Sequence, residues 1–74
     1  MKLNEMNKDL EWARSVRRKY ANWEFINKQP PRIKAALIYL VETGDLYVAS
    51  RIANLTVEEM DELRMKANIP IVIP

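Results

Sequence analysis

Apolar residues recur every three or four positions along the first third of the chain, which is the spacing of one face of an α-helix. No glycine or proline interrupts this run before Pro30. The pattern predicts a long amphipathic helix over residues 1–28, clearest from about residue 7 to residue 27. We expect its apolar face either to pack over the rest of the chain or to pair with the same helix of a second copy. The stripe consists of Leu3, Met6, Leu10, Ala13, Val16, Tyr20, Trp23 and Ile26.

Two adjacent prolines end this first helix and begin the next. Pro30 and Pro31 disfavour helical backbone in the residue before them, and Pro31 suits the first turn of a new helix. Apolar residues at helical spacing follow, and Gly44, the single glycine of the chain, is placed to end the run. The sequence therefore predicts a second helix over residues 31–43.

Residues 45–68 have the pattern of two short helices joined by a tight turn. Asp45 precedes the first, which we expect over about residues 47–53, and the second is expected over about residues 57–67. Asn54 can adopt the left-handed backbone of the turn, and Thr56 can cap the second helix together with Glu59. The unit is predicted to be a helix-turn-helix. Its inward-facing apolar residues are Ala49, Ala53, Leu55, Met60 and Leu63.

The chain ends in an apolar, β-branched run punctuated by prolines, Ile-Pro-Ile-Val-Ile-Pro over residues 69–74. We expect an extended tail that forms an edge strand, covers the core of its own domain, or adds to a partner. Packing on its own core or in a dimer is the favoured alternative. The predicted fold is thus all-α with a short extended tail.

The composition limits what so short a chain can do. A single domain over residues 1–74 buries only about 60% of the surface of its unfolded form, so we expect a homodimer. With no cysteine and no histidine, disulfides, thiolate metal sites and the usual neutral-pH base are missing, so we expect neither an enzyme nor a cofactor. The longest apolar run, residues 35–41, is far below the ~20 residues of a membrane span. We therefore expect a cytoplasmic protein without membrane contact. The predicted partner and dimer interface consists of Leu10, Val16, Tyr20, Trp23, Ile69, Ile71 and Ile73.

Charge is distributed unevenly although the net charge is only +2. Residues 1–34 hold nine basic side chains against four acidic ones, whereas residues 35–74 hold three against six. Arg14, Arg17, Arg18 and Lys19 form the strongest basic cluster, which we expect on the face of the first helix opposite the apolar stripe. The cluster is either a solvated helix face or a contact for phosphate or an acidic partner. Nearby aromatic residues such as Trp12 leave open stacking on single-stranded bases.

The segment from Gly44 to Pro70 resembles the C-terminal half of a family of small prokaryotic antitoxins, the VapB-type partners of PIN-domain ribonuclease toxins. The family pattern runs from a glycine after an apolar helix, through a helix-turn-helix, to a terminal Asn/Gly-Ile-Pro. The usual turn glycine of that family is replaced by Asn54, and the N-terminal helix does not match its commoner members. The matching positions are Gly44, Ala49, Ile52, Ala53, Asn54, Leu55, Thr56, Glu59, Met60, Glu62, Leu63, Asn68, Ile69 and Pro70.

The resemblance implies an autoregulatory DNA-binding protein that neutralises a toxin protein. The residues themselves argue partly against DNA contact, because Glu58, Glu59, Asp61 and Glu62 lie where the second helix would meet the phosphates. We keep two hypotheses: a DNA-binding regulator, and a protein-interaction module that uses the two helices as a scaffold. The candidate DNA and phosphate contacts are Arg14, Arg17, Arg18, Lys19, Arg51, Thr56, Arg64 and Lys66.

Overall fold

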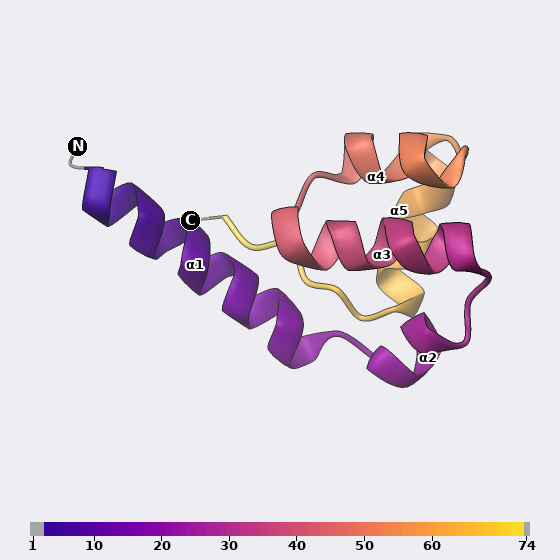
Figure 1. Ribbon diagram of the computed structural model, residues 1–74, viewed down its shortest axis with the longest axis horizontal. Coiled ribbons are helices and arrows are strands. Elements are labelled where there is room, and N and C mark those ends of the chain that lie inside the picture. Colours follow the sequence, from indigo (N-terminus) through magenta and orange to yellow (C-terminus); the bar gives the residue numbers. More distant parts are fainter. Residues whose placement is uncertain (1–2, 74) are drawn as a thin grey trace.

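The computed structural model describes the backbone of residues 3–73 and the side chains of residues 8–73. The described chain is all-helical, as predicted, and no strand occurs within it. Its elements, drawn in Figure 1, are α1 (Leu3–Tyr20), α2 (Trp23–Asn27), α3 (Pro31–Thr43), α4 (Leu46–Ala53) and α5 (Val57–Lys66). No helix of this described part is both long enough and apolar enough to cross a membrane.

The single helix predicted over residues 1–28 is wrong, because the chain breaks at Ala21 and Asn22 into α1 and α2. The side chain of Asn22 accepts a hydrogen bond from the backbone N–H of Phe25, at 3.1 Å, and so caps a new helix. The N–H of Asn22 donates to the carbonyl of Ala67, at 2.7 Å, instead of continuing α1. The apolar spacing carries on through this break, which is why periodicity alone missed it.

Helix α3 is the centre of the molecule and has the bounds that the sequence predicts. Pro31 lies in its first turn, and Gly44 ends it with a left-handed φ of 73°. The helix contacts α1, α2 and α4, and α5 packs in turn on α4. Its buried residues form the middle of the core together with residues from α2, α5 and the tail. The largest fully buried side chains are Ile26, Leu37, Leu40, Val41, Met60 and Ile69.

After α5 the chain turns at Asn68, whose φ is 53°, and runs on as an extended segment. Ile69 is 1% exposed and belongs to the core, whereas Ile71 and Ile73 are 70% and 85% exposed. The tail therefore covers its own core only at its root. Its last residue, Pro74, and the side chains of Leu3 and Met6 in the predicted stripe lie outside the described residues.

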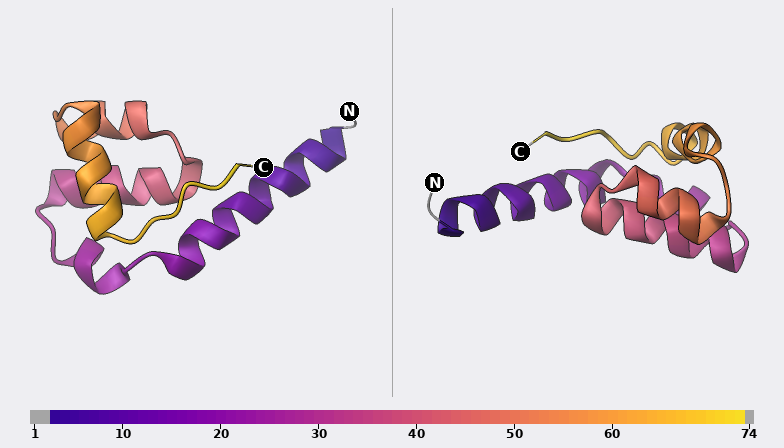
Figure 2. Two further views of the ribbon diagram at one scale, coloured as in Figure 1. Left: turned by 180° about the vertical axis from the view of Figure 1, so that it is seen from behind. Right: turned by 90° about the horizontal axis from the view of Figure 1, so that it is seen from above.

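The N-terminal half of α1 and the tail both project from the same end of the helical body (Figures 1 and 2). The molecule is consequently elongated, with extents of 39 × 22 × 17 Å. The body itself consists of α2 to α5 and the C-terminal half of α1, where Ala13 and Arg17 are buried. The two projections leave apolar side chains in solvent.

Candidate nucleic-acid and partner interfaces

Helices α4 and α5 are joined by the three residues Asn54 to Thr56. Asn54 ends α4 with a left-handed φ of 57°, which lets the chain reverse within this short connection. Ala49, Ala53 and Met60 are buried, so the two helices meet through small side chains and one flexible one. The lengths and the turn agree with the expected bounds to within one residue.

Thr56 begins α5 with a reciprocal cap. Its hydroxyl accepts from the N–H of Glu59 at 3.1 Å, and the Glu59 carboxylate accepts from the N–H of Thr56 at 3.0 Å. These bonds to Thr56 hold the pKa of Glu59 below its ordinary value. The Thr56 hydroxyl thus already accepts one hydrogen bond within the chain, and one carboxylate of α5 is held at the helix N-terminus.

The N-terminal half of α5 is acidic on its exposed side. Glu58, Glu59 and Glu62 are exposed, while Asp61 pairs with Arg64 at 2.6 Å. Arg64 also donates to the carbonyl of Ile69 at 2.9 Å, and its side chain is largely buried. Arg64 is therefore a structural tie between α5 and the tail, and it offers little charge to an external phosphate.

The prediction that Arg17 lies on a solvent-exposed face is wrong, because Arg17 is only 6% exposed. Its Nε donates to the carbonyl of Val41 at 2.7 Å and its Nη2 to the carbonyl of Glu42 at 3.4 Å. Both acceptors belong to the last turn of α3, where carbonyls lack partners within the helix. Burial, and then the nearby charge of Arg14, lower the pKa of Arg17. The guanidinium fastens α1 to the C-terminal end of α3.

Arg14 and Arg18 join the same contact from either side of Arg17. Arg18 holds the Glu42 carboxylate through two bonds of 2.9 and 2.6 Å, and Arg14 donates to the Glu42 carbonyl at 3.1 Å. The Arg18 bond lowers the pKa of Glu42 and raises that of Arg18. We call Arg14, Arg17, Arg18 and Glu42 the arginine clasp. Three of the four residues in the predicted basic cluster therefore serve the fold.

The apolar periodicity does not predict this clasp, but one acidic residue in the sequence indicates it. Glu42 is the only acidic residue between Glu24 and Asp45, and it lies in the last turn of a helix. A carboxylate there is opposed by the helix macrodipole unless cations compensate for it. Three arginines at helical spacing elsewhere in the chain were the available partners.

The basic side chains that stay exposed are fewer than the sequence suggests. Lys19 and Arg51 are both exposed, Lys19 over the Tyr20 ring at 5.5 Å and Arg51 over the Tyr47 ring at 5.8 Å. Lys66, in the last turn of α5, is exposed as well. Of the candidate phosphate contacts, Lys19, Arg51 and Lys66 keep their charges accessible without an anionic partner among the described residues.

The expected interface residues divide into an exposed set and a buried one. Leu10 and Tyr20 are about half exposed, Trp23 somewhat less, and Val16 is half-buried. The Trp23 indole donates to the carbonyl of Arg18 at 2.9 Å, so its ring bridges α1 and α2. Ile69 was wrongly expected at an interface, because the turn at Asn68 directs it into the core. Ile71 and Ile73 stay exposed.

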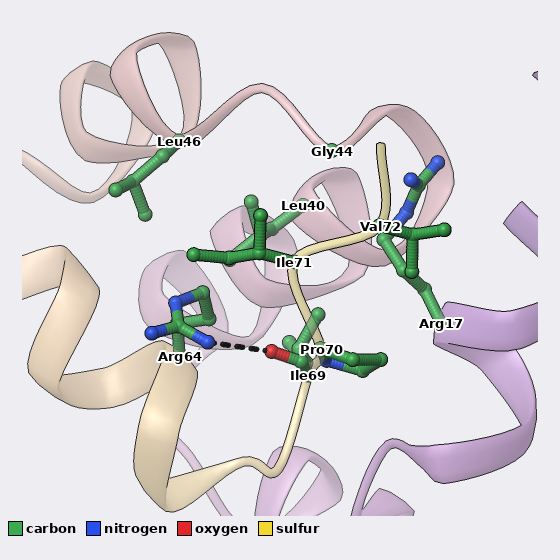
Figure 3. Close-up of a pocket in the computed structure, with 9 residues that line it drawn as sticks. All are labelled: Arg17, Leu40, Gly44, Leu46, Arg64, Ile69, Pro70, Ile71 and Val72. Carbon is green, nitrogen blue, oxygen red and sulfur yellow. Dashed lines mark hydrogen bonds between the residues drawn. The ribbon is translucent and has the colours of Figure 1, made fainter. Parts of the chain in front are cut away.

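A pocket of about 170 Å³ lies between the tail, the end of α3 and the start of α4 (Figure 3). Leu40, Leu46 and Ile71 supply apolar walls, and Arg17 and Arg64 bring two guanidinium groups to it. In Figure 3 Ile71 and Val72 point to opposite sides of the tail, with Val72 beside Arg17. Sequence reasoning did not anticipate this pocket, since its walls come from four helices and the tail.

Comparisons of the chain with models of protein families, with curated proteins and with solved structures find no match. Among the described residues, no group of three or more acidic side chains is placed to hold a metal ion. The candidate surfaces are thus the exposed cations near α4 and α5, the apolar face of projecting α1, and the tail.

Proposed function

We propose that this protein is a small antitoxin-like regulator that binds DNA through a helix-turn-helix formed by α4 and α5. The observation that carries the proposal is the short left-handed turn at Asn54 between two packed helices, the second of which begins at a capping box. The resemblance of residues 44–70 to antitoxins supports the same function. A dimer would bring two such units to one DNA duplex.

Lys19, Arg51 and Lys66 are the basic residues that we propose for phosphate contact. Each is exposed and outside the arginine clasp, whereas neutralising Arg17 or Arg18 would remove hydrogen bonds that join α1 to α3. The exposed carboxylates of α5 would repel a phosphate backbone. We therefore expect weak binding that depends strongly on salt, with phosphate contacts from the last turns of α4 and α5 and from Lys19 of α1.

A salt titration of duplex DNA binding tests this proposal. Replacing Arg51 and Lys66 by glutamate should abolish binding at low salt, and in wild-type protein the affinity should fall steeply as salt increases. Lys28→Glu is the matched control, because Lys28 lies outside the two-helix motif, at the end of α2, where it pairs with Glu24. Absence of binding by the wild-type protein at low salt, with the fold intact by circular dichroism, would contradict DNA recognition.

A second candidate function is favoured by the exposed apolar residues of α1 and the tail. We propose that these surfaces associate with a second copy of the chain or with a toxin protein, while α4 and α5 act as a scaffold. Leu10, Trp12, Ile71 and Ile73 are all more than half exposed, and they belong to the two segments that project from the same end of the body.

Light scattering tests the second function, while the salt titration tests the first. A dimer, or a stable complex with a purified PIN-domain nuclease encoded beside this chain, would support it. A protein that stays monomeric at every concentration and binds no such nuclease would contradict it. DNA binding by a strict monomer would then leave the first proposal standing alone.

A further inference from the structure

The exposed tail is an extended segment with no strand beside it among the described residues. Pro70 to Ile73 run extended beyond the core, and their side chains alternate in exposure, with Ile71 and Ile73 outside and Val72 half-buried. No backbone hydrogen bond joins residues 70–73 to the rest of the described chain. The N–H groups of Ile71, Val72 and Ile73 are therefore without an intramolecular partner in this part of the structure.

The root of this segment is held firmly. Ile69 is buried, its N–H donates to the carbonyl of Arg64 at 3.1 Å, and its carbonyl accepts from Arg64 at 2.9 Å. The Asn68 amide also donates to the carbonyl of Tyr20 at 2.9 Å. Because the tail leaves the body from a fixed point, little further ordering is needed for it to pair with another strand.

The sequence of the tail is the same in both directions around Val72. Residues 70–74 read Pro-Ile-Val-Ile-Pro. Two copies placed antiparallel about a two-fold axis at Val72 bring Ile71 opposite Ile73 of the second copy, and each proline opposite a proline. A segment of this kind is complementary to itself, as a symmetric dimer interface requires.

The prolines select one of the two antiparallel hydrogen-bond patterns. If the two Val72 residues form a hydrogen-bonded pair, the next such pairs involve prolines, which have no N–H to donate. If they form a non-hydrogen-bonded pair, Ile71 and Ile73 of both copies exchange all their N–H and C=O groups, and the prolines fall at non-bonded positions. The second pattern makes four bonds and leaves no proline where a donor is needed.

We propose that two copies of this chain dimerise by pairing their tails as a short antiparallel β-ribbon centred on Val72, with Ile71 and Ile73 as the hydrogen-bonded residues. The inference deepens the proposed self-association and rests on it. The exposed isoleucines of one tail then pack against those of the other on one face of the ribbon. Val72 lies on the opposite face, where Figure 3 shows it on the same side as Arg17 of α1.

Single-cysteine variants of the full chain test the register, since the natural sequence contains no cysteine. In Val72→Cys the two Cα atoms should lie about 4.5 Å apart, within the reach of a disulfide. In Ile71→Cys they are diagonal neighbours at about 7–8 Å, beyond that reach. We expect Val72→Cys to form the covalent dimer at least about tenfold faster under mild oxidation, as measured on non-reducing gels.

N-methylation in chemically synthesised protein tests the hydrogen bonds while keeping every side chain. A methyl group on the Ile73 nitrogen removes two of the four bonds in the dimer and should raise its Kd by about thirtyfold. The same methyl group on Val72 is the matched control, because that nitrogen points away from the partner strand, and it should leave the Kd nearly unchanged.

Three outcomes are informative. Faster cross-linking at Val72 together with a selective effect at Ile73 supports the ribbon. A dimer that cross-links equally at both positions, and whose Kd neither methyl group changes, uses another surface. That result overturns the ribbon but leaves the proposed self-association standing. A wild-type monomer at all concentrations, including one whose tail pairs only with a sheet edge of a different protein, overturns both.

Discussion

Arg17 shows how one residue changes its role between sequence and structure. Its place in a run of basic residues suggested a contact for phosphate, yet its guanidinium is buried against the carbonyls of Val41 and Glu42. The helical position of a cation on an amphipathic helix does not show whether its neighbours are water or the open end of another helix. For Arg17 the neighbours are the carbonyls at the end of α3.

Replacing Arg17 by methionine should lower the free energy of unfolding by about 2–3 kcal/mol, because its charged hydrogen bonds to two carbonyls are lost and the carbonyl of Val41 loses its side-chain donor. Lys19→Met on the same helix is the control and should change stability by less than about 0.5 kcal/mol. Urea unfolding followed by circular dichroism measures both. Equal effects of the two substitutions would mean that α1 is not fastened through Arg17.

Gly44 is a second residue whose environment makes a firm prediction. Its φ is 73°, and a Cβ there would lie 2.9 Å from Nη1 and 3.1 Å from Cζ of Arg17. Gly44→Ala should therefore cost about 1–2 kcal/mol for the left-handed backbone, plus the displacement of Arg17. Asn54→Gly, at a φ of 57°, is the opposite case and should be neutral or slightly stabilising. Thermal unfolding of both variants checks the contrast.

At the scale of elements, the sequence predicts helices well where a stop signal and a cap coincide. Pro31 and Gly44 delimit α3, and Thr56 with Glu59 begins α5, because these residues determine backbone geometry locally. The break between α1 and α2 combines the local cap that Asn22 gives α2 with a bond from the Asn22 N–H to Ala67, which is far away in sequence. Local patterns cannot contain such a contact.

The candidate site was less predictable than the helices for the same reason. Exposed cations such as Arg51 and Lys66 are where the sequence suggests, since nothing competes for them. Arg64 is instead tied to Asp61 and to the carbonyl of Ile69. The oxygen atoms that bind these arginine side chains belong to helix ends and a turn. Only the tertiary fold brings them close to the arginines.

The joint between α1 and α3 should weaken in acid. Hydrogen bonding to Arg18 lowers the folded-state pKa of Glu42 below its ordinary value of 4.5, so the unfolded chain binds more protons as the pH falls through this range. The stabilisation is present above about pH 4.5 and is lost as the pH falls toward the folded pKa. Glu59 should act in the same direction at the start of α5.

Urea unfolding between about pH 5.5 and about pH 3 measures this dependence. Glu42→Gln should unfold more easily than wild type at the upper end and lose less stability on acidification. Glu59→Gln separates the contribution of α5, because a glutamine can still accept the N–H of Thr56. An acid dependence unchanged by Glu42→Gln would show that the clasp does not couple α1 to protonation.

At the scale of the whole molecule, the surface is larger than the chain length requires. The accessible area is 5232 Å², whereas a compact protein of this mass exposes about 4,700 Å². The radius of gyration, 12.4 Å, likewise exceeds the roughly 11 Å of a compact domain. The excess comes from the two projections, α1 and the tail, which a second copy can cover without any change in the body.

If association covers these projections, thermal stability should depend on protein concentration, because mass action favours the folded dimer over two unfolded chains. For a domain of this size the Tm should rise by about 4 °C for each tenfold increase above the dimer Kd. Ile71→Asp with Ile73→Asp should remove the dependence if the tail forms the interface, whereas Leu10→Asp should do so if α1 forms it. Calorimetry over a wide concentration range decides between them, and a constant Tm in the wild-type protein would mean that both projections remain uncovered in solution.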